Sequence, residues 1–272
     1  LIGIEVKGSK RWIDFGILPR FQPIELLKPF VIVALSIILT INKFKSLYVR
    51  YLFTFILISP VLILLILQPD IGQTILIILV WFSLIFISGI NLIFFFSFFS
   101  VLGLIISYLI YFIPKFSYIK LRLFSFLNPI SGNNYQSEKA SEAIINGGLF
   151  GRGIGEGTLN SKIPEAHTDY IVSVISEEFG IIIVILIMIA FLVLSFKVMR
   201  KIDEENDNTT KLILLGSITL ILLQTFIHIG VNIRILPTTG MTLPYLSYGG
   251  SSIISTAILS GIILNLTKRQ IN

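Results

Sequence analysis

The sequence predicts an all-α protein that crosses a membrane several times. Of its 272 residues, 54% are hydrophobic and only 13% are charged, whereas soluble domains carry about 25% charged residues. The apolar residues also form long blocks, such as 51–67 and 92–113, which approach or exceed the ~20 residues that a helix needs to cross hydrocarbon. A water-soluble globule is therefore excluded. The chain has no cysteine, so disulfides and thiolate metal sites are excluded too.

Seven apolar segments are expected to be transmembrane helices, because backbone polar groups inside lipid need partners within their own segment. We place the ends of these helices where charged residues, proline and glycine gather. We treat 1–272 as a single transmembrane domain in which 113–170 forms one long outer loop. The expected spans are 25–41, 51–67, 72–88, 91–112, 171–196, 212–230 and 251–266.

Basic residues in the short loops predict which helix ends face the cytoplasm. Lysine and arginine gather in 42–50, in 197–211 and at 268–269, and seven spans place all three on one side. We assign that side to the cytoplasm. The outer segments also contain lysine and arginine, which favours a surface for an anionic ligand, with solvated loop charge as the alternative. These outer segments are 1–24, 68–71, 113–170 and 231–250.

A first pair of candidate site residues lies at the start of the first span. Glu25 and Lys28 are three residues apart, so they share one helix face and can pair. Ionised groups at the edge of a bilayer are costly unless they pair or face water. The sequence therefore predicts a site here, with a purely structural ion pair as the alternative.

A second candidate is the glycine-rich stretch 146–157 of the long outer loop, in which Arg152 is the basic residue. Exposed N–H groups of a glycine-rich backbone suit close approach to a phosphate. The stretch fits neither a P-loop nor a dinucleotide fingerprint. It is therefore a candidate anion-binding segment, with a flexible surface loop as the alternative.

A third candidate is the segment 163–170, directly before the fifth span. Asp169, Ser173 and Glu177 recur every four residues and would share one face of a helix that starts near residue 168. Beside His167, Asp169 could be a general base, a metal ligand or a helix N-cap. The chain has only 2 histidines, too few for a histidine-rich metal site.

Four motifs in one order resemble the SEDS family (shape, elongation, division and sporulation), to which FtsW and RodA belong. The residues of these motifs are more similar to those of the division branch, FtsW, than to those of the elongation branch, RodA. Ile24 departs from the small polar residue that is usual in the family, whereas Glu25 and Lys28 match. The motifs are Lys10–Trp12 with Phe21–Lys28, Gln68–Gly72, Pro164–Tyr170 with Glu177–Gly180, and Gly230–Asn232 with Leu236–Thr238 and Ser247–Ser252.

The resemblance implies a ten-helix bundle with both chain ends in the cytoplasm. Seven spans that start outside then imply that about three N-terminal helices are missing. The chain also opens on Leu1 without a signal-peptide motif, so we expect a fragment. The implied location is the cytoplasmic (inner) membrane of a bacterium, at the division septum.

The resemblance implies a peptidoglycan glycosyltransferase that polymerises lipid II, a disaccharide-pentapeptide on undecaprenyl pyrophosphate, at the outer membrane face. The acceptor 4-hydroxyl would attack the donor anomeric carbon with inversion, and Asp169 matches the family's catalytic Asp, a general base. Cationic side chains would stabilise the leaving pyrophosphate; Arg11, Lys28 and Arg152 are the candidates. The full set of expected substrate-binding residues is Arg11, Glu25, Lys28, Arg152, Glu165 and His167.

No tightly bound cofactor is expected, although a divalent cation (Mg²⁺ or Mn²⁺) could assist the leaving group. Besides lipid II, the resemblance implies a class B penicillin-binding protein, a transpeptidase, and other division membrane proteins as partners. We expect the transpeptidase to dock on the fifth and sixth spans through close packing and a few polar contacts. Nucleic acid is not an expected partner.

Three other functions stay open at this point. A lipid II flippase would need the same cavity and external bases, but transporters place their polar groups near the membrane midplane, whereas here they gather at the outer mouth. An elongation polymerase of the RodA type would use the same chemistry. A scaffold without catalysis would have no use for Asp169.

Overall fold

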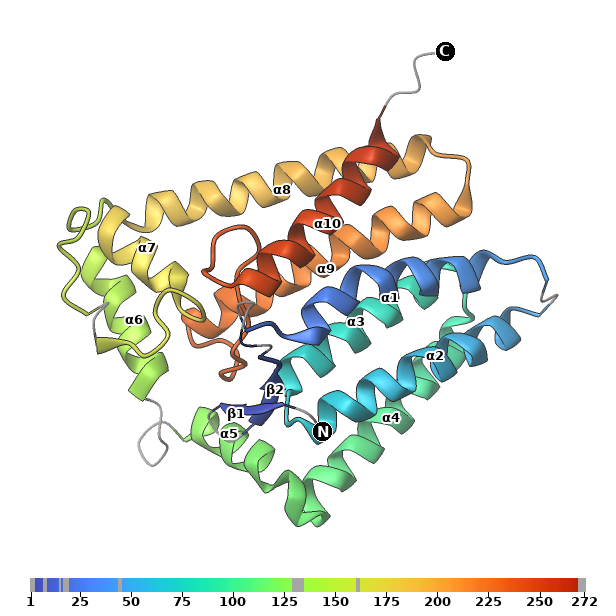
Figure 1. Ribbon diagram of the computed structural model, residues 1–272, viewed down its shortest axis with the longest axis horizontal. Coiled ribbons are helices and arrows are strands. Elements are labelled where there is room, and N and C mark those ends of the chain that lie inside the picture. The colour runs from blue at the N-terminus through green and yellow to red at the C-terminus, as the bar shows by residue number, and fades with distance from the viewer. Residues whose placement is uncertain are drawn as a thin grey trace. The chain divides into compact units, whose positions relative to one another are not determined.

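The computed structural model describes residues 3–6, 9–14, 16, 20–43, 46–128, 135–159 and 162–268. These residues form ten α-helices, a short 3₁₀ helix and two short strands (Figure 1). The α-helices are α1 (Pro23–Thr40), α2 (Leu47–Leu67), α3 (Ile71–Ile87), α4 (Leu92–Phe112), α5 (Ser117–Leu127), α6 (Tyr135–Gly147), α7 (Ile171–Phe179), α8 (Ile181–Glu204), α9 (Asn208–Asn232) and α10 (Gly250–Thr267).

Six of these helices are long and apolar enough to cross a membrane, namely α1, α2, α4, α8, α9 and α10. Helix α3 is also apolar, but with 17 residues it is shorter than these six helices. The bounds of α1, α2, α3, α4, α9 and α10 agree with the expected spans to within four residues. Hydropathy and the clustering of charge at helix ends thus predicted most of the helical frame.

The expected span 171–196 is wrong, because the chain breaks at Gly180 into two helices, α7 and α8. Gly180 has a φ of 84°, in the left-handed region that favours glycine. A Cβ at this position would lie 2.2 Å from the carbonyl oxygen of Leu149. The break therefore depends on the lack of a side chain, and it leaves α8 without the two glutamates at 177 and 178.

Two regions that we expected as loops contain regular structure. The N-terminal segment forms an antiparallel pair, β1 (Ile4–Val6) and β2 (Ser9–Trp12), with Ile4 opposite Trp12. The outer segment 113–170 contains the 3₁₀ helix η1 (Pro114–Phe116) as well as α5 and α6. The described chain is thus mainly, but not purely, α-helical.

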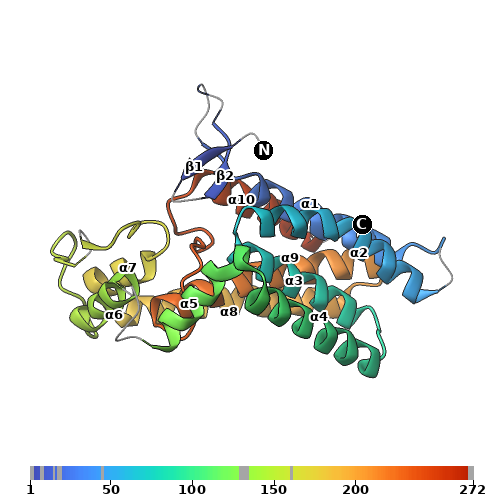
Figure 2. The same cartoon turned by 90° about the horizontal axis from the view of Figure 1, so that it is seen from below.

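The chain divides into two compact units. The first unit contains Leu1–Ser88, Leu186–Phe226 and Met241–Asn272, and the second contains Gly89–Ile185 and Ile227–Gly240. In the second unit, α6 packs beside α7 (Figure 2).

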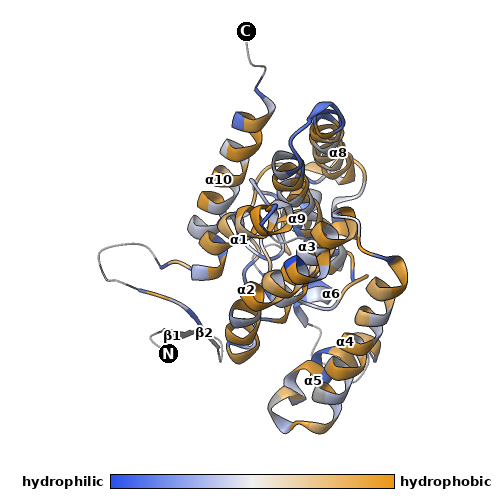
Figure 3. Ribbon diagram, turned by 90° about the vertical axis from the view of Figure 1, so that its right-hand side faces the viewer, coloured by the Kyte–Doolittle hydropathy of each residue, from blue (hydrophilic) through white to orange (hydrophobic). Residues whose placement is uncertain are grey.

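In the first unit, α1 packs against α2, α3 and α10. A Cβ at Gly216 of α9 would lie 2.7 Å from Ile32 of α1 and 3.2 Å from Leu84 of α3. A small residue at this position lets the three helices approach closely, which is how helices associate in lipid. The outward surfaces of these helices are apolar (Figure 3).

Side-chain contacts in the first unit sort the helix ends into two groups. At one end, Gln22 donates to Asp70, so the segments 1–24 and 68–71 meet. At the other end, the hydroxyls of Thr40 and Thr209 lie 2.9 Å apart. This grouping confirms the predicted pairing of helix ends within the first unit; which end faces the cytoplasm stays a prediction.

Candidate active site

Asp169 lies directly before α7 in the second unit, and its main chain is fixed by a turn. Its N–H donates to the carbonyl of Glu165, at 3.0 Å, and Glu165 itself has a φ of 60°. The N-cap residue of α7 is Tyr170, which makes no side-chain capping hydrogen bond. The interpretation of Asp169 as the helix N-cap is therefore wrong, because the N-cap position falls one residue later, at Tyr170.

Asn232, the last residue of α9, supplies the contact that a cap would have made. Its Oδ1 accepts from the N–H of Ser173, at 3.2 Å, and from the Ser173 hydroxyl, at 2.8 Å. Its Nδ2 donates to the carbonyls of Asp169, at 3.2 Å, and of His228, at 2.8 Å. This fully buried amide thus ties the start of α7 and the backbone of Asp169 to α9.

The carboxylate of Asp169 is half-buried and borders Gly240. A Cβ at Gly240 would lie 3.5 Å from Oδ2 of Asp169, and Gly240 has a φ of 70°. The charge of the Asp169 carboxylate also affects the pKa of the neighbouring Tyr170. Burial raises the pKa of Tyr170 most, the negative charge of Asp169 raises it further, and Arg122 opposes both. Asp169 and Arg122 therefore act on the same small region.

Glu165 and His167 flank Asp169 on its N-terminal side, and both are exposed. The hydroxyl of Thr168 donates to the main-chain carbonyl of Glu165, at 3.2 Å, and to its carboxylate, at 3.1 Å. Glu165 thus stabilises the turn that carries Asp169. The structure therefore places these two predicted residues within four positions of the candidate base.

Two N–H groups of the glycine-rich stretch, which we predicted as an anion-binding segment, are used within the protein. The N–H groups of Arg152 and Gly153 donate to the carbonyls of Glu177, at 2.9 Å, and Glu178, at 3.0 Å. These donors at the end of α7 are therefore not available for a phosphate. The Arg152 side chain is exposed, and its guanidinium donates to the carbonyl and the side-chain oxygen of Asn146.

Close packing explains the glycines in this stretch. A Cβ at Gly147 would lie 1.9 Å from the carbonyl oxygen of Ser176, and one at Gly151 would lie 2.2 Å from that of Glu178. Backbone meets backbone here, so any side chain would push α7 away. The alternative of a freely flexible loop is wrong for the same reason.

Glu177 of α7 forms the junction with α6 and with residues 158–159. It is fully buried, and its Oε1 accepts from the N–H groups of Thr158, at 3.1 Å, and Leu159, at 3.0 Å, and from the Asn146 amide, at 3.0 Å. A buried carboxylate needs several donors of this kind. We infer that Glu177 fixes the outer segment that leads to Asp169.

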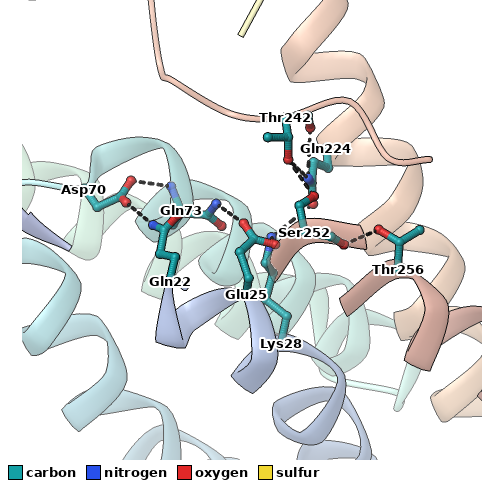
Figure 4. A network of polar contacts seen from close by, with 9 residues as sticks. All are labelled: Gln22, Glu25, Lys28, Asp70, Gln73, Gln224, Thr242, Ser252 and Thr256. Carbon is teal, nitrogen blue, oxygen red and sulfur yellow. Dashed lines mark hydrogen bonds and ion pairs between the residues drawn. The ribbon is translucent and has the colours of Figure 1, made fainter. Parts of the chain in front are cut away.

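In the first unit, a network of polar contacts begins at Arg11 (Figure 4 shows its continuation from Gln22). The guanidinium of Arg11 lies 3.3 Å from the carboxylate of Asp70. Asp70 also accepts from the Gln22 amide, at 3.0 Å, and from the N–H of Gln73, at 3.2 Å, as N-cap of α3. Burial raises the pKa of Asp70, and the positive charge of Arg11 opposes this shift.

The network continues to the predicted pair. Lys28 and Glu25 form an ion pair of 2.8 Å, which confirms the pairing expected from their spacing. The Gln73 amide donates to the other oxygen of Glu25, at 2.7 Å, and Lys28 donates to Gln224 of α9, at 3.1 Å. Both charged side chains are buried; Figure 4 shows them between α3 and α10.

From Gln224 the network reaches the last outer segment. The Gln224 amide donates to the carbonyl of Thr242, at 2.9 Å. The hydroxyls of Thr242 and Ser252 lie 2.7 Å apart. The motif Ser247–Ser252 is therefore joined to the pair Glu25–Lys28 through the buried amide of Gln224.

The predicted site residues thus fall into two groups. Arg11, Glu25 and Lys28 share the network of the first unit, whereas Arg152, Glu165, His167 and Asp169 belong to the second. That both groups face one cavity stays a prediction. Within the described ranges, no three His, Cys, Asp or Glu side chains are placed to hold a metal ion.

Sequence reasoning missed four residues that organise these groups. Gln73 and Gln224 are single amides in apolar helices. Their burial would have indicated a role, but the sequence alone does not show it. Asp70 and Asn232 lay within recognised motifs, but nothing in the sequence showed which groups they would contact.

These features define a multi-pass membrane protein whose polar groups gather at one end of the helices of the first unit and beside α7 in the second. The chain belongs to the FtsW/RodA/SpoVE family, because the family model described as a cell cycle protein matches residues 1–272.

Two relatives show the degree of similarity. A probable peptidoglycan glycosyltransferase FtsW of Caulobacter vibrioides is 33% identical over 275 residues, which cover 99% of this chain and 68% of that protein. The corresponding protein of Buchnera aphidicola is 37% identical, with 98% and 77% covered.

Solved structures have the same fold. A chain from work described as the structural coordination of polymerization and crosslinking by a peptidoglycan synthase complex matches with a TM-score of 0.81, at 26% identity, over 100% of this chain and 77% of that one. The rod shape determining protein RodA of Thermus thermophilus matches with a TM-score of 0.68, at 25% identity, over 100% and 73%.

Proposed function

We propose that the protein is an inverting glycosyltransferase that polymerises lipid II into glycan strands at the outer face of the bacterial cytoplasmic membrane during division. Relatives described as FtsW glycosyltransferases support this reaction. The observation that carries the proposal is the setting of Asp169. Its backbone is held by Asn232 and Glu165, while its carboxylate is only half-buried.

This setting suits a general base. The acceptor 4-hydroxyl is a poor nucleophile, and a positioned carboxylate that takes its proton is worth roughly 10²- to 10⁴-fold in rate. A base must be held at a fixed position yet remain open to substrate. Asn232 provides the first condition, and Gly240 helps with the second because it places no side chain against Oδ2 of Asp169.

The other predicted residues are proposed to bind substrate, with different requirements. Arg152, Glu165 and His167 are exposed and can meet a ligand directly. Arg11 is partly accessible, whereas Glu25 and Lys28 are buried. We expect Glu25 and Lys28 to reach substrate only if the contacts of the network open.

We further propose seven membrane crossings, with α3 as the seventh, in a bundle of the ten-helix type. The proposed partner is a class B penicillin-binding protein, since one relative of known structure comes from a complex that couples polymerization and crosslinking. Its docking surface is assigned to α8 and α9, which correspond to the fifth and sixth expected spans. The division septum is the proposed location.

The test is the substitution Asp169→Asn in the full-length protein, assayed with purified lipid II. The amide keeps the shape of the side chain but cannot take the proton, so glycan synthesis should fall at least ~10²-fold. Asp207→Asn, in the linker between α8 and α9, is the matched control and should keep its activity. Size-exclusion chromatography should show both variants folded.

Near-normal polymerisation by the Asp169→Asn variant would show that Asp169 is not the base. If the wild-type protein moves lipid II across a membrane without polymerising it, the flippase function is correct instead.

A further inference from the structure

The three basic residues predicted to stabilise a leaving diphosphate are already held within the protein. Arg11 pairs with Asp70, Lys28 pairs with Glu25 and Gln224, and Arg152 donates to Asn146. Cationic groups attached to the segments around Asp169 are further candidates for this role.

The segment 232–240 surrounds Asp169 on one side. Its first residue, Asn232, donates to the Asp169 carbonyl, and its last, Gly240, faces the Asp169 carboxylate. Between them the chain turns tightly, since the N–H groups of Ile235 and Leu236 both donate to the carbonyl of Gly230, at 2.8 and 3.0 Å. Both ends of this segment therefore lie beside the candidate base.

Arg234 lies in this turn with a φ of 59°, a conformation that non-glycine residues adopt rarely and at a cost. Its guanidinium is 32% exposed and lies 3.8 Å from the carboxylate of Glu138, itself 42% exposed. A pair at this distance and exposure contributes little to stability. Glycine adopts this conformation without that cost, so neither the backbone nor the weak ion pair gives the Arg234 side chain much of a stabilising role.

Arg122 of α5 reaches the same segment from another direction. Its guanidinium donates to the carbonyl of Thr238 at 3.4 Å, a long hydrogen bond on an exposed side chain. It also acts on the hydroxyl of Tyr170, next to Asp169. Two guanidinium groups, from α5 and from the turn after α9, thus attach to the segment that borders the candidate base.

We propose that Arg122 and Arg234 bind the diphosphate group of a polyprenyl-linked sugar substrate, and that Glu138 competes with this ligand for Arg234. The inference rests on the proposed function. Guanidinium groups bind phosphate oxygens in a paired, planar geometry.

The charge balance of the reaction fits this position. The acceptor oxygen forms a bond to the anomeric carbon while its proton passes to Asp169. The bond from that carbon to the diphosphate breaks, and the electron pair leaves with the diphosphate oxygen. Cations within reach of the departing oxygen stabilise this charge as it develops.

The test measures binding rather than turnover, so it does not depend on catalysis. Full-length protein with the Asp169→Asn substitution is titrated in nanodiscs with undecaprenyl diphosphate and, in parallel, with undecaprenyl monophosphate. Arg122→Gln and Arg234→Gln should each weaken diphosphate binding about 10-fold, the loss of one charge-assisted hydrogen bond. Glu138→Gln should strengthen it.

Lys139→Gln is the matched control. Lys139 follows Glu138 in α6, and it pairs with Glu142 instead of Arg234. Its substitution removes the same charge from the same unit, so binding should change less than about 2-fold. An equal loss in Lys139→Gln and Arg234→Gln would overturn the proposal, because attraction would then depend on overall charge alone. An equal loss for monophosphate and diphosphate lipids would overturn the assignment of the diphosphate.

Arg234→Gly separates binding from folding. Glycine relieves the left-handed backbone and removes the charge, so the melting temperature should rise or stay while diphosphate binding falls. If both fall together, Arg234 serves the fold and the proposal is wrong. If polymerisation requires Asp169 while both arginine variants bind normally, this inference fails and the proposed function stands.

Discussion

The two units place their charged groups in opposite ways. In the first unit, Arg11, Asp70, Glu25 and Lys28 form a mostly buried network that extends through amides and hydroxyls. In the second unit, the backbone of Asp169 is fixed while the residue is only half-buried, and the nearby Arg122 is exposed and Arg234 partly exposed.

This difference separates two uses of charge. The attraction within a buried ion pair offsets the desolvation cost of its charges only in part or about evenly, but removal of one partner leaves a buried charge without compensation. A group that acts on substrate needs a fixed position and an open face. The network joins α1, α3 and α9 of the first unit, which suits a structural role, and the segment around Asp169 suits chemistry. The predictions below test that division.

The largest effect is expected for Lys28→Met. Methionine fills a similar volume but leaves the buried carboxylate of Glu25 without its cation, which should destabilise the fold by about 3–5 kcal/mol. Lys201→Met is the control, since Lys201 pairs with Glu204 at 3.5 Å on an exposed surface and should cost at most about 1 kcal/mol. Thermal unfolding of the detergent-solubilised protein measures both. Equal melting temperatures would contradict a structural role for the network.

A smaller effect is expected for Glu177→Gln. The N–H groups of Thr158, Leu159 and Asn146 then donate to a neutral amide oxygen instead of a carboxylate. The weaker hydrogen bonds should destabilise this junction by about 1–3 kcal/mol. Limited proteolysis between residues 148 and 165 should become faster. The exposed Glu156, substituted in the same way, provides the reference. Unchanged cleavage in both variants would show that the packed glycines alone hold the segment.

The smallest effect is expected for Asp207→Ala, before α9. The side-chain and backbone hydrogen bonds of Thr210 lower the pKa of Asp207. The contribution of Asp207 is therefore present above the pKa of the unfolded chain and is lost as the pH falls through the lower, folded value. We expect about 0.5–1 kcal/mol at neutral pH.

The melting-temperature difference between Asp207→Ala and wild type should be present at pH 6 and decrease progressively as the pH falls below 3.8, the ordinary pKa of an aspartate. A difference that persists at the lower pH would indicate that Asp207 acts through contacts other than its charge.

Hydropathy predicted where the helices lie, but not how backbone conformation divides them. The run from 171 to 196 is apolar enough to read as one helix, and only the left-handed Gly180 shows that there are two. The glycine-rich stretch presents a related difficulty. Glycine permits both a phosphate and a second backbone to approach, and the sequence does not say which one is there.

Chemical type and spacing predicted local pairs, but not distant partners. The ion pair of Glu25 and Lys28 follows from a spacing of three residues, whereas Gln224, the other partner of Lys28, is 196 residues away. The position of Asp169 was evident from its motif. That it is not a helix cap became clear only through Asn232, 63 residues further on.

The break at Gly180 has a consequence for how the chain enters the membrane. A single helix over 171–196 would place Glu177 and Glu178 within the inserting segment, and an acidic residue there disfavours insertion, by up to about 2.5–3.5 kcal/mol for an aspartate at the helix centre. Because α8 begins at Ile181, the translocon meets a segment that is apolar until Lys197, and the basic residues that follow act as a stop-transfer signal. One glycine thus separates the glutamates of α7 from α8, which has the composition of an ordinary hydrophobic anchor.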